Sequence, residues 1–132
     1  MAVSLIVSEN LYPDAPYAYA AVAEGAGLVF TAGACPLDPS GKVVAPGDIP
    51  AQMRQALSNL TEALGAAGCT IGDVLKTTVY VAAHSREDLL AAWAEVASCF
   101  GKHPSPSTLV GVSFLGYRDQ LVEIEAVALR DA

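Results

Sequence analysis

The sequence predicts a single α+β domain in which two helices cover one face of a sheet of about six strands. The length of 132 residues fits one domain. Two segments carry apolar residues at steps of three and four, which is typical of amphipathic helices. The other apolar runs are short, β-prone and bounded by Gly, Pro and Asp. This order of elements suits a sheet with helices layered on one side.

The N-terminal part is expected to form strands and loops. Residues 4–8 form a short β-prone stretch, and residues 12–16 hold two prolines, which prevent regular ladder bonding. Two apolar runs, 19–23 and 28–32, are joined by a Glu-Gly-Ala-Gly segment and predict a hairpin. Residues 33–47 are rich in Pro, Gly and Asp, and indicate a loop.

The clearest helix is predicted over residues 48–67. Asp48 is the expected N-cap, Pro50 falls in the first turn, and Gly68 is the expected stop. One apolar stripe runs along it through Ile49, Met53, Leu57, Leu60, Leu64 and Ala67.

A second helix is predicted over residues 85–100, with Ser85 and Asp88 resembling a capping box. Its stripe consists of Leu89, Trp93, Val96 and Phe100. Strands are expected at 74–82, before this helix, and at 107–114 and 120–129, after it. The helices cover one sheet face, and the last strand has apolar residues on both faces. We therefore expect a homo-oligomer that buries the second sheet face between subunits.

Composition excludes several classes of function. Net charge is −7 and no cluster of Lys or Arg exists, which argues against nucleic-acid binding. No apolar run is long enough to span a membrane, and the N-terminus lacks the features of a signal peptide. Three scattered cysteines, Cys35, Cys69 and Cys99, favour the reducing cytoplasm over a disulfide framework. His84 and His103 have no partners at metal-ligand spacing, so no metal site is expected.

Glu123 is the best single candidate for chemistry. It lies between Val122 and Ile124 on a half-buried strand, where desolvation disfavours the charged carboxylate and suits a general acid or base. Periodicity alone favours the simpler interpretation, in which Glu123 and Glu125 line a solvated strand face.

The segment 103–108 leads into a strand, and its two prolines stiffen it. It is able to present Ser107 or Thr108 to a ligand, or it is simply a rigid turn. Trp93 lies in the stripe of the second helix, where an aromatic side chain usually belongs to the core.

Four blocks of this sequence, in order, resemble the RidA (YjgF, L-PSP) family over nearly the whole chain. They are LVFTAG (28–33) with PLD (36–38), QMRQALSNLTEALGAAG (52–68), DVLKTTVYV (73–81) and VEIEAVA (122–128). The resemblance implies a chorismate-mutase-like α+β fold, with a six-stranded mixed sheet, two helices on one face and a homotrimer. Ligand pockets are then expected in the clefts between subunits.

The resemblance also implies an activity that needs no cofactor or metal. Active members hydrolyse reactive imines and enamines, made from amino acids by pyridoxal-phosphate enzymes, to 2-keto acids and ammonia. Glu123 matches the strand glutamate that orients the attacking water, and Gly33 matches the pocket glycine. Tyr19 matches the pocket tyrosine, although a small shift in alignment would place Tyr17 there.

Three positions depart from the family pattern. Pro106 stands where an arginine normally grips the substrate carboxylate, Ala34 replaces the usual Gln, and Trp93 replaces a pocket Asn. Losing a bidentate, charge-assisted contact costs on the order of 2–3 kcal/mol. The pocket is therefore expected to be more apolar. Arg118, beside Tyr117, is either a substitute cation at the pocket mouth or a solvated loop residue.

Two functions follow as alternatives. One is an imine or enamine deaminase with a larger or less acidic substrate and Glu123 orienting water. The other is a metabolite-binding or sensing trimer that has lost the chemistry along with the arginine. Ribonuclease activity, claimed for some relatives, is disfavoured by the acidic charge and by the lack of a His pair.

Overall fold

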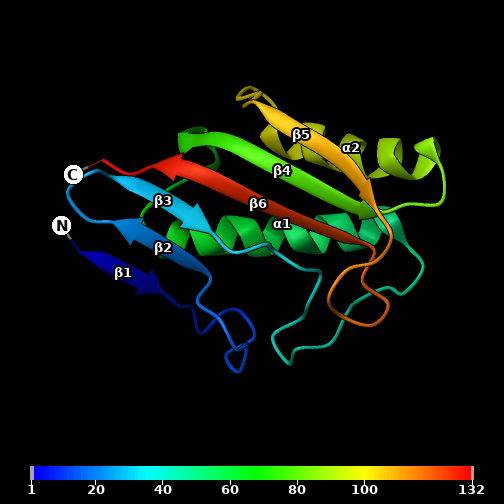
Figure 1. Ribbon diagram of the computed structural model, residues 1–132, viewed down its shortest axis with the longest axis horizontal. Coiled ribbons are helices and arrows are strands. Elements are labelled where there is room, and N and C mark those ends of the chain that lie inside the picture. The colour runs from blue at the N-terminus through cyan, green and yellow to red at the C-terminus, as the bar shows by residue number, and fades with distance from the viewer. Residues whose placement is uncertain (1, 132) are drawn as a thin grey trace.

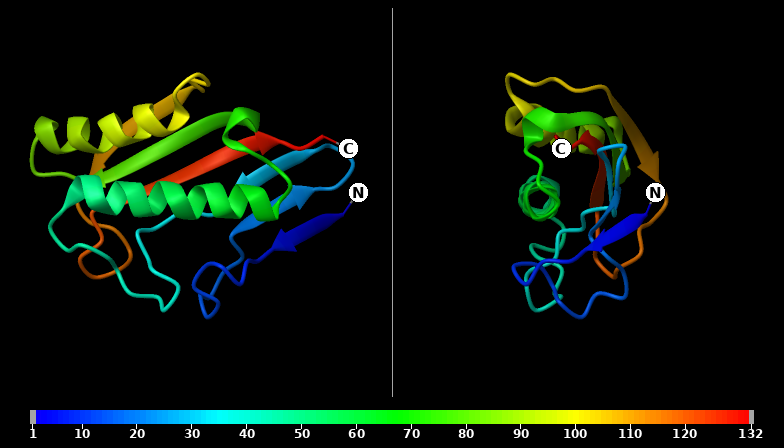
Figure 2. Two further views of the ribbon diagram at one scale, coloured as in Figure 1. Left: turned by 180° about the vertical axis from the view of Figure 1, so that it is seen from behind. Right: turned by 90° about the vertical axis from the view of Figure 1, so that its left-hand side faces the viewer.

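The computed structural model describes residues 2–131, and across them the chain forms one six-stranded sheet with two helices on one face (Figures 1 and 2). The strands are β1 (Val3–Ile6), β2 (Ala20–Ala23), β3 (Leu28–Thr31), β4 (Val74–Ala82), β5 (Ser107–Val112) and β6 (Val122–Leu129). The helices are α1 (Ile49–Ala66) and α2 (Arg86–Phe100), and a short 3-10 turn, η1, covers Ile71–Asp73. The predicted α+β class is confirmed.

The sheet order is β1-β2-β3-β6-β4-β5, so the last strand of the chain lies at the centre between β3 and β4. β4 and β5 are parallel, with Thr77 opposite Ser107, and the other neighbours are antiparallel. A parallel pair needs a crossover connection, which α2 provides. The sheet is therefore mixed, as the resemblance implied.

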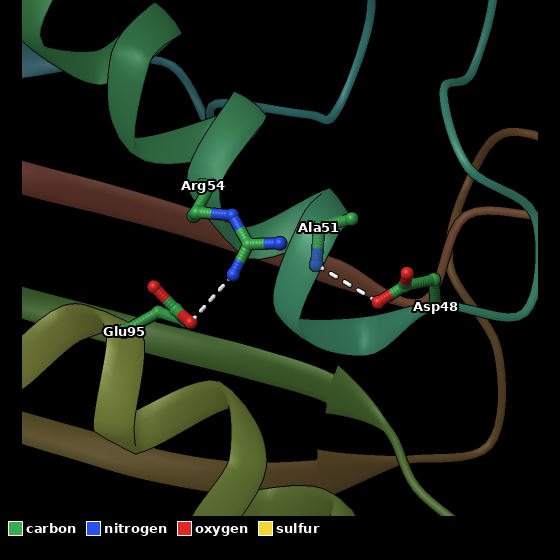
Figure 3. Close-up of polar contacts among 4 residues, drawn as sticks. All are labelled: Asp48, Ala51, Arg54 and Glu95. Carbon is green, nitrogen blue, oxygen red and sulfur yellow. Dashed lines mark hydrogen bonds and ion pairs between the residues drawn. The ribbon is translucent and has the colours of Figure 1, made fainter.

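Helix α1 begins and ends as its sequence predicts. The Asp48 carboxylate accepts a hydrogen bond from the Ala51 backbone N–H at 3.0 Å (Figure 3), and this satisfies one of the free donors of the first turn. Gly68 follows the helix with a φ of +86°, which Gly adopts without strain. The residues of the predicted apolar stripe are all buried against the sheet.

Helix α2 has a modified capping box. The Ser85 hydroxyl accepts from the Asp88 N–H at 3.3 Å, whereas the Asp88 carboxylate accepts from His84 N–H rather than from Ser85. The two helices are joined at the surface by an Arg54–Glu95 ion pair of 2.7 Å (Figure 3). The Arg54 side chain is 59% exposed, so this pair contributes no more than about 1 kcal/mol. Apolar packing, not charge, attaches α2.

Several strand ends differ from the sequence prediction. β1 covers Val3–Ile6 rather than residues 4–8, and β2 and β3 are each one residue shorter than expected. The differences after α2 bear on the site. β5 ends at Val112 rather than at residue 114, and β6 begins at Val122 rather than at residue 120. Gln120 belongs instead to a turn, because its backbone N–H donates to the Tyr117 carbonyl and its side chain accepts from the Tyr117 N–H. A side chain that closes its own turn competes with strand pairing.

The sheet face opposite the helices is open. In β6 every second residue, Val122 onward, is buried towards the helices, whereas Glu123 and Glu125 point to the open face and are half-buried. Large apolar side chains are exposed on the same face at Leu5 (71%) and Phe30 (49%). Within residues 2–131 no helix combines the length and the apolar character needed to cross a membrane.

Candidate functional site

Glu123 lies in a hollow of about 280 Å³, which we call the carboxylate hollow. Its lining includes Tyr17, Gly33, Cys35, Tyr117, Gln120 and Glu123. The hollow exists because the chain beyond β3 stays alongside β6: Ala34 and Ile124 exchange two backbone hydrogen bonds of 2.6 and 3.1 Å. The residues on either side of Ala34 are thereby brought next to Glu123.

Gly33 supplies the space that the carboxylate occupies. A Cβ built on Gly33 would overlap Oε2 of Glu123 and come within 2.8 Å of its Cγ. Any larger residue would therefore push the Glu123 side chain away. The glycine here serves close approach, since its φ is not in the left-handed region.

The other carboxylate oxygen of Glu123 is held by two donors. The Gln120 amide donates to Oε1 at 3.1 Å, and the Cys35 thiol donates to it at 3.4 Å. Burial, and then the negative charge of Glu123, raise the pKa of the Cys35 thiol to about 12, so the thiol stays protonated and remains a donor. Oε1 is thus fixed, and Oε2 faces the backbone at Gly33.

Two tyrosine hydroxyls meet in this hollow. The hydroxyls of Tyr17 and Tyr117 lie 3.1 Å apart, and burial is the main cause that raises the pKa of Tyr17. Tyr19 lies in edge-to-face contact with Tyr17, and its hydroxyl donates to the Tyr12 carbonyl at 2.6 Å. Tyr17, rather than Tyr19, therefore lines the hollow that holds Glu123.

Buried Gln52 fixes the loop that carries Tyr117 and Gln120. Its amide donates to the Asp119 carbonyl at 2.9 Å, and its carbonyl oxygen accepts from the Leu121 N–H at 2.8 Å. The side chain is fully buried on α1. The loop geometry at Glu123 is thus anchored to the helix layer across the sheet.

Further polar groups lie on the open face of the sheet, where Tyr80 pairs with Glu123 and Lys76 pairs with Val127. Glu125 accepts from the Tyr80 hydroxyl at 2.7 Å, and this hydrogen bond is the main cause that raises the Tyr80 pKa. The Lys76 ammonium donates to the Thr108 hydroxyl at 2.6 Å on the exposed part of β5. Lys76 is a cation that the sequence reading did not single out.

A second hollow, of about 170 Å³, lies between α2 and the segment that leads into β5. Thr77, Trp93, Val96, Phe100, Pro104 and Ser107 are among its lining residues. We call it the apolar hollow, since Thr77, Ser105 and Ser107 are the only residues with polar side chains among the described residues that line it. None of the described residues that line either hollow is Lys or Arg.

The structure thus divides the residues predicted from sequence. Glu123, Gly33 and Tyr117 share the carboxylate hollow, whereas Trp93 and Ser107 share the apolar hollow. The buried Ala34 side chain lines neither one.

Two further candidates lie outside both hollows. Pro106 is exposed, and its carbonyl accepts from the Thr77 N–H at 2.9 Å. Arg118 is exposed in the loop before β6 and lines a shallow depression on the other side of Tyr117. Arg118 does not line the carboxylate hollow.

Sequence reasoning missed Cys35 and Gln120. Cys35 lies in the loop where the sequence places it, but nothing pointed to its contact with Glu123, and Gln120 was expected at the start of a strand rather than in a turn. The one available signal was a polar amide three residues before Glu123, at a position that an extended strand would direct to the opposite face. Only the turn at 117–120 brings the amide to the carboxylate.

The fold and the two hollows place this chain in a class of protein: a small α+β domain with a carboxylate on the open face of its sheet. A family model described as endoribonuclease L-PSP matches residues 8–130. A RutC family protein of Pyrococcus horikoshii is 37% identical over 96% of this chain and 98% of its own length. The 2-iminobutanoate/2-iminopropanoate deaminase of Salmonella typhimurium is 36% identical over 95% of this chain and 96% of its own.

A solved structure agrees with these matches. The YjgF gene product of E. coli superimposes with a TM-score of 0.80 at 34% identity, covering 97% of this chain and 99% of that one. The chain therefore belongs to the RidA (YjgF, L-PSP) family, as the four sequence blocks predicted.

Proposed function

We propose that this protein hydrolyses reactive imines or enamines, with Glu123 as the catalytic residue. The observation that carries the proposal is the fixed carboxylate: Gln120 and Cys35 hold Oε1, while Gly33 leaves room for Oε2 beside an open hollow. A carboxylate held in this way is suited to orient and deprotonate a water molecule.

The reaction needs only water as a co-reactant. The water oxygen bonds to the imine carbon while Glu123 takes up one water proton, and the C=N electron pair moves to nitrogen, which receives that proton from Glu123. In the resulting amino alcohol, Glu123 takes the hydroxyl proton and passes it to the nitrogen. The C=O bond then forms as the C–N bond breaks, and ammonia is released.

The proposed assembly is a homotrimer with the site in the cleft between subunits. Two features support it. The resemblance assigns Glu123 and Trp93 to one pocket, but within a single chain they line two separate hollows. A pocket that contains both residues therefore needs the Glu123 of one chain and the Trp93 of another. The open sheet face also exposes Leu5 and Phe30, and exposed apolar patches of this kind mark interfaces. A cytoplasmic location, suited to free cysteines, is part of the same proposal.

The test is imine decay in the presence of an amino-acid oxidase that generates imines in situ. Wild-type protein should release keto acid and ammonia faster than buffer for at least one imine of an aliphatic and aromatic panel. Glu123→Gln should lower this rate by about 100-fold or more. Glu125→Gln, on the same face two residues along, is the matched control and should retain it. No acceleration by wild-type protein with any imine would refute the enzyme proposal.

A second candidate is a metabolite-binding trimer without chemistry. It is favoured by the absence of Lys and Arg from the described lining of both hollows, since a carboxylate-bearing imine would then lack its usual partner. A ligand that raises the melting temperature equally in wild type and Glu123→Gln, and is not consumed, would support this alternative.

A further inference from the structure

The apolar hollow has the size and the walls of a site for a small ring. Its volume of about 170 Å³ is close to the roughly 150 Å³ of an engineered apolar cavity that binds benzene. Trp93 and Phe100 contribute two aromatic walls, and Val96 and Pro104 contribute aliphatic ones. Aromatic rings pack favourably against such surfaces, in offset or edge-to-face geometry.

One polar feature lies among these apolar walls. The hydroxyls of Thr77 and Ser107 are 2.6 Å apart, and Thr77 is only 1% exposed. Within the pair one hydroxyl donates and the other accepts, so the accepting hydroxyl keeps its own hydrogen for another partner. The hollow can therefore satisfy one hydroxyl or carbonyl group on a ring.

Charge is excluded from the interior of this hollow. None of the described residues that line it is Lys, Arg, His, Asp or Glu. An ionised group placed inside would lose its hydration without gaining a counter-ion, which is strongly unfavourable. The chemistry of the walls thus selects uncharged rings.

We infer that the apolar hollow binds an uncharged aromatic ring, of about the size of a phenyl group and bearing at most one hydrogen-bonding substituent. If the ring is the side chain of the imine, the substrates are imines with an aromatic side chain, and this part of the inference rests on the proposed function. Ring binding itself does not involve Glu123, which lies on the other face of the sheet.

The chain offers a direct probe, since Trp93 is its only tryptophan. Phenol is titrated into the full-length protein while the fluorescence of Trp93 is recorded, and benzoate serves as the charged ring of similar size. Phenol should change the emission saturably. Benzoate should bind at least about tenfold more weakly, because no cation lines the hollow.

Two alanines of α2 give a matched pair of variants. Ala97 lines the hollow and Ala94 does not, and both are exposed. Ala97→Leu should fill the entrance and weaken phenol binding by about tenfold or more. Ala94→Leu should leave the titration unchanged.

Each outcome decides the inference. A non-saturable phenol response, equal binding of benzoate, or unchanged binding in Ala97→Leu would overturn it. Glu123→Gln separates it from the proposed function, since this variant should keep phenol binding and lose imine hydrolysis. If phenol binds but no imine is hydrolysed by wild-type protein, the ring site stands and the enzyme proposal fails. If imines are hydrolysed with no preference for aromatic side chains, the substrate class is refuted and the proposed function stands.

Discussion

The carboxylate hollow and the apolar hollow lie on opposite faces of the same sheet and are built by opposite means. On the open face, Glu123 is fixed by an amide and a thiol, and two tyrosine hydroxyls stand nearby. On the helix side, Trp93 and Phe100 surround one hydroxyl pair. The carboxylate hollow holds a charged group in a fixed orientation, which suits catalysis. The apolar hollow excludes charge, which suits the selection of an uncharged ligand. Four predictions, from the largest effect to the smallest, test this difference between the two hollows.

The largest effect is expected from Gly33→Ala. The added methyl overlaps the end of the Glu123 side chain, which must turn away, so imine hydrolysis should fall by about 100-fold or more. Stability should fall by about 2 kcal/mol or less, because turning Glu123 away breaks its hydrogen bonds with Gln120 and Cys35 but leaves the backbone in place. Rates and urea unfolding measure the two effects. Gly116→Ala, in the same hollow with no atom near its Cβ position, is the control. Equal losses in both variants would contradict the role of Gly33.

The next effect concerns the support of the carboxylate hollow. Gln52→Leu leaves the Asp119 carbonyl and the Leu121 N–H without their buried partner, and should lower the free energy of unfolding by about 3 kcal/mol. Gln55→Leu on the same helix removes one hydrogen bond, to Asn59, and should cost about 0.5 kcal/mol or less. Denaturation at one fixed protein concentration measures both, since an oligomer's stability depends on concentration. If the Gln52 variant is as stable as the Gln55 variant, the loop before β6 keeps its conformation without Gln52.

A pH dependence follows from Cys35. Its folded-state pKa, about 12, lies above that of an unfolded thiol, near 8.5, so above pH 8.5 the unfolded chain loses a proton that the folded chain keeps. Wild-type stability should therefore decline as pH rises through this range. Between pH 8 and pH 10 the decline should exceed that of Cys35→Ala by about 2 kcal/mol. Parallel curves for the two proteins would mean that the thiol is not shielded.

The smallest effect tests the hydroxyl pair of the apolar hollow. Thr77→Val leaves the Ser107 hydroxyl without its partner and should destabilise the protein by about 1 kcal/mol. In the Thr77→Val background, Glu123→Gln should lower the rate of imine hydrolysis by the same factor as in the wild type. Thr61→Val, on the exposed side of α1 where water can replace the hydroxyl, should cost less. A larger loss in the Thr61 variant would contradict the importance of the buried hydroxyl pair.

Much of the fold could be predicted because its signals are local. The stripe of α1, the Asp48 cap and the Gly68 stop depend on residues a few positions apart, and all are found as expected. The errors lie at strand ends, where Gln120 prefers a turn closed by its own side chain. Such a preference depends on which partner is within reach, and the alternation of apolar residues does not encode it.

The candidate site was predicted only in part for the same reason. Glu123 was singled out from its position on a half-buried strand, and Gly33 through the resemblance. The structure adds that the two residues lie together, since a Cβ at position 33 would overlap the Glu123 carboxylate. Cys35 and Gln120, which hold the carboxylate, escaped notice because they come from segments 85 residues apart in the chain.

The sequence by itself determined the class of the fold, the helix limits and the family. These depend on residue type and short spacing, which can be read directly from the chain. The tertiary structure alone decided that Tyr17 rather than Tyr19 lines the hollow of Glu123, and that Trp93 belongs to a second hollow. The reason is physical: β6 inserts between β3 and β4, and only this long-range pairing determines which distant side chains meet.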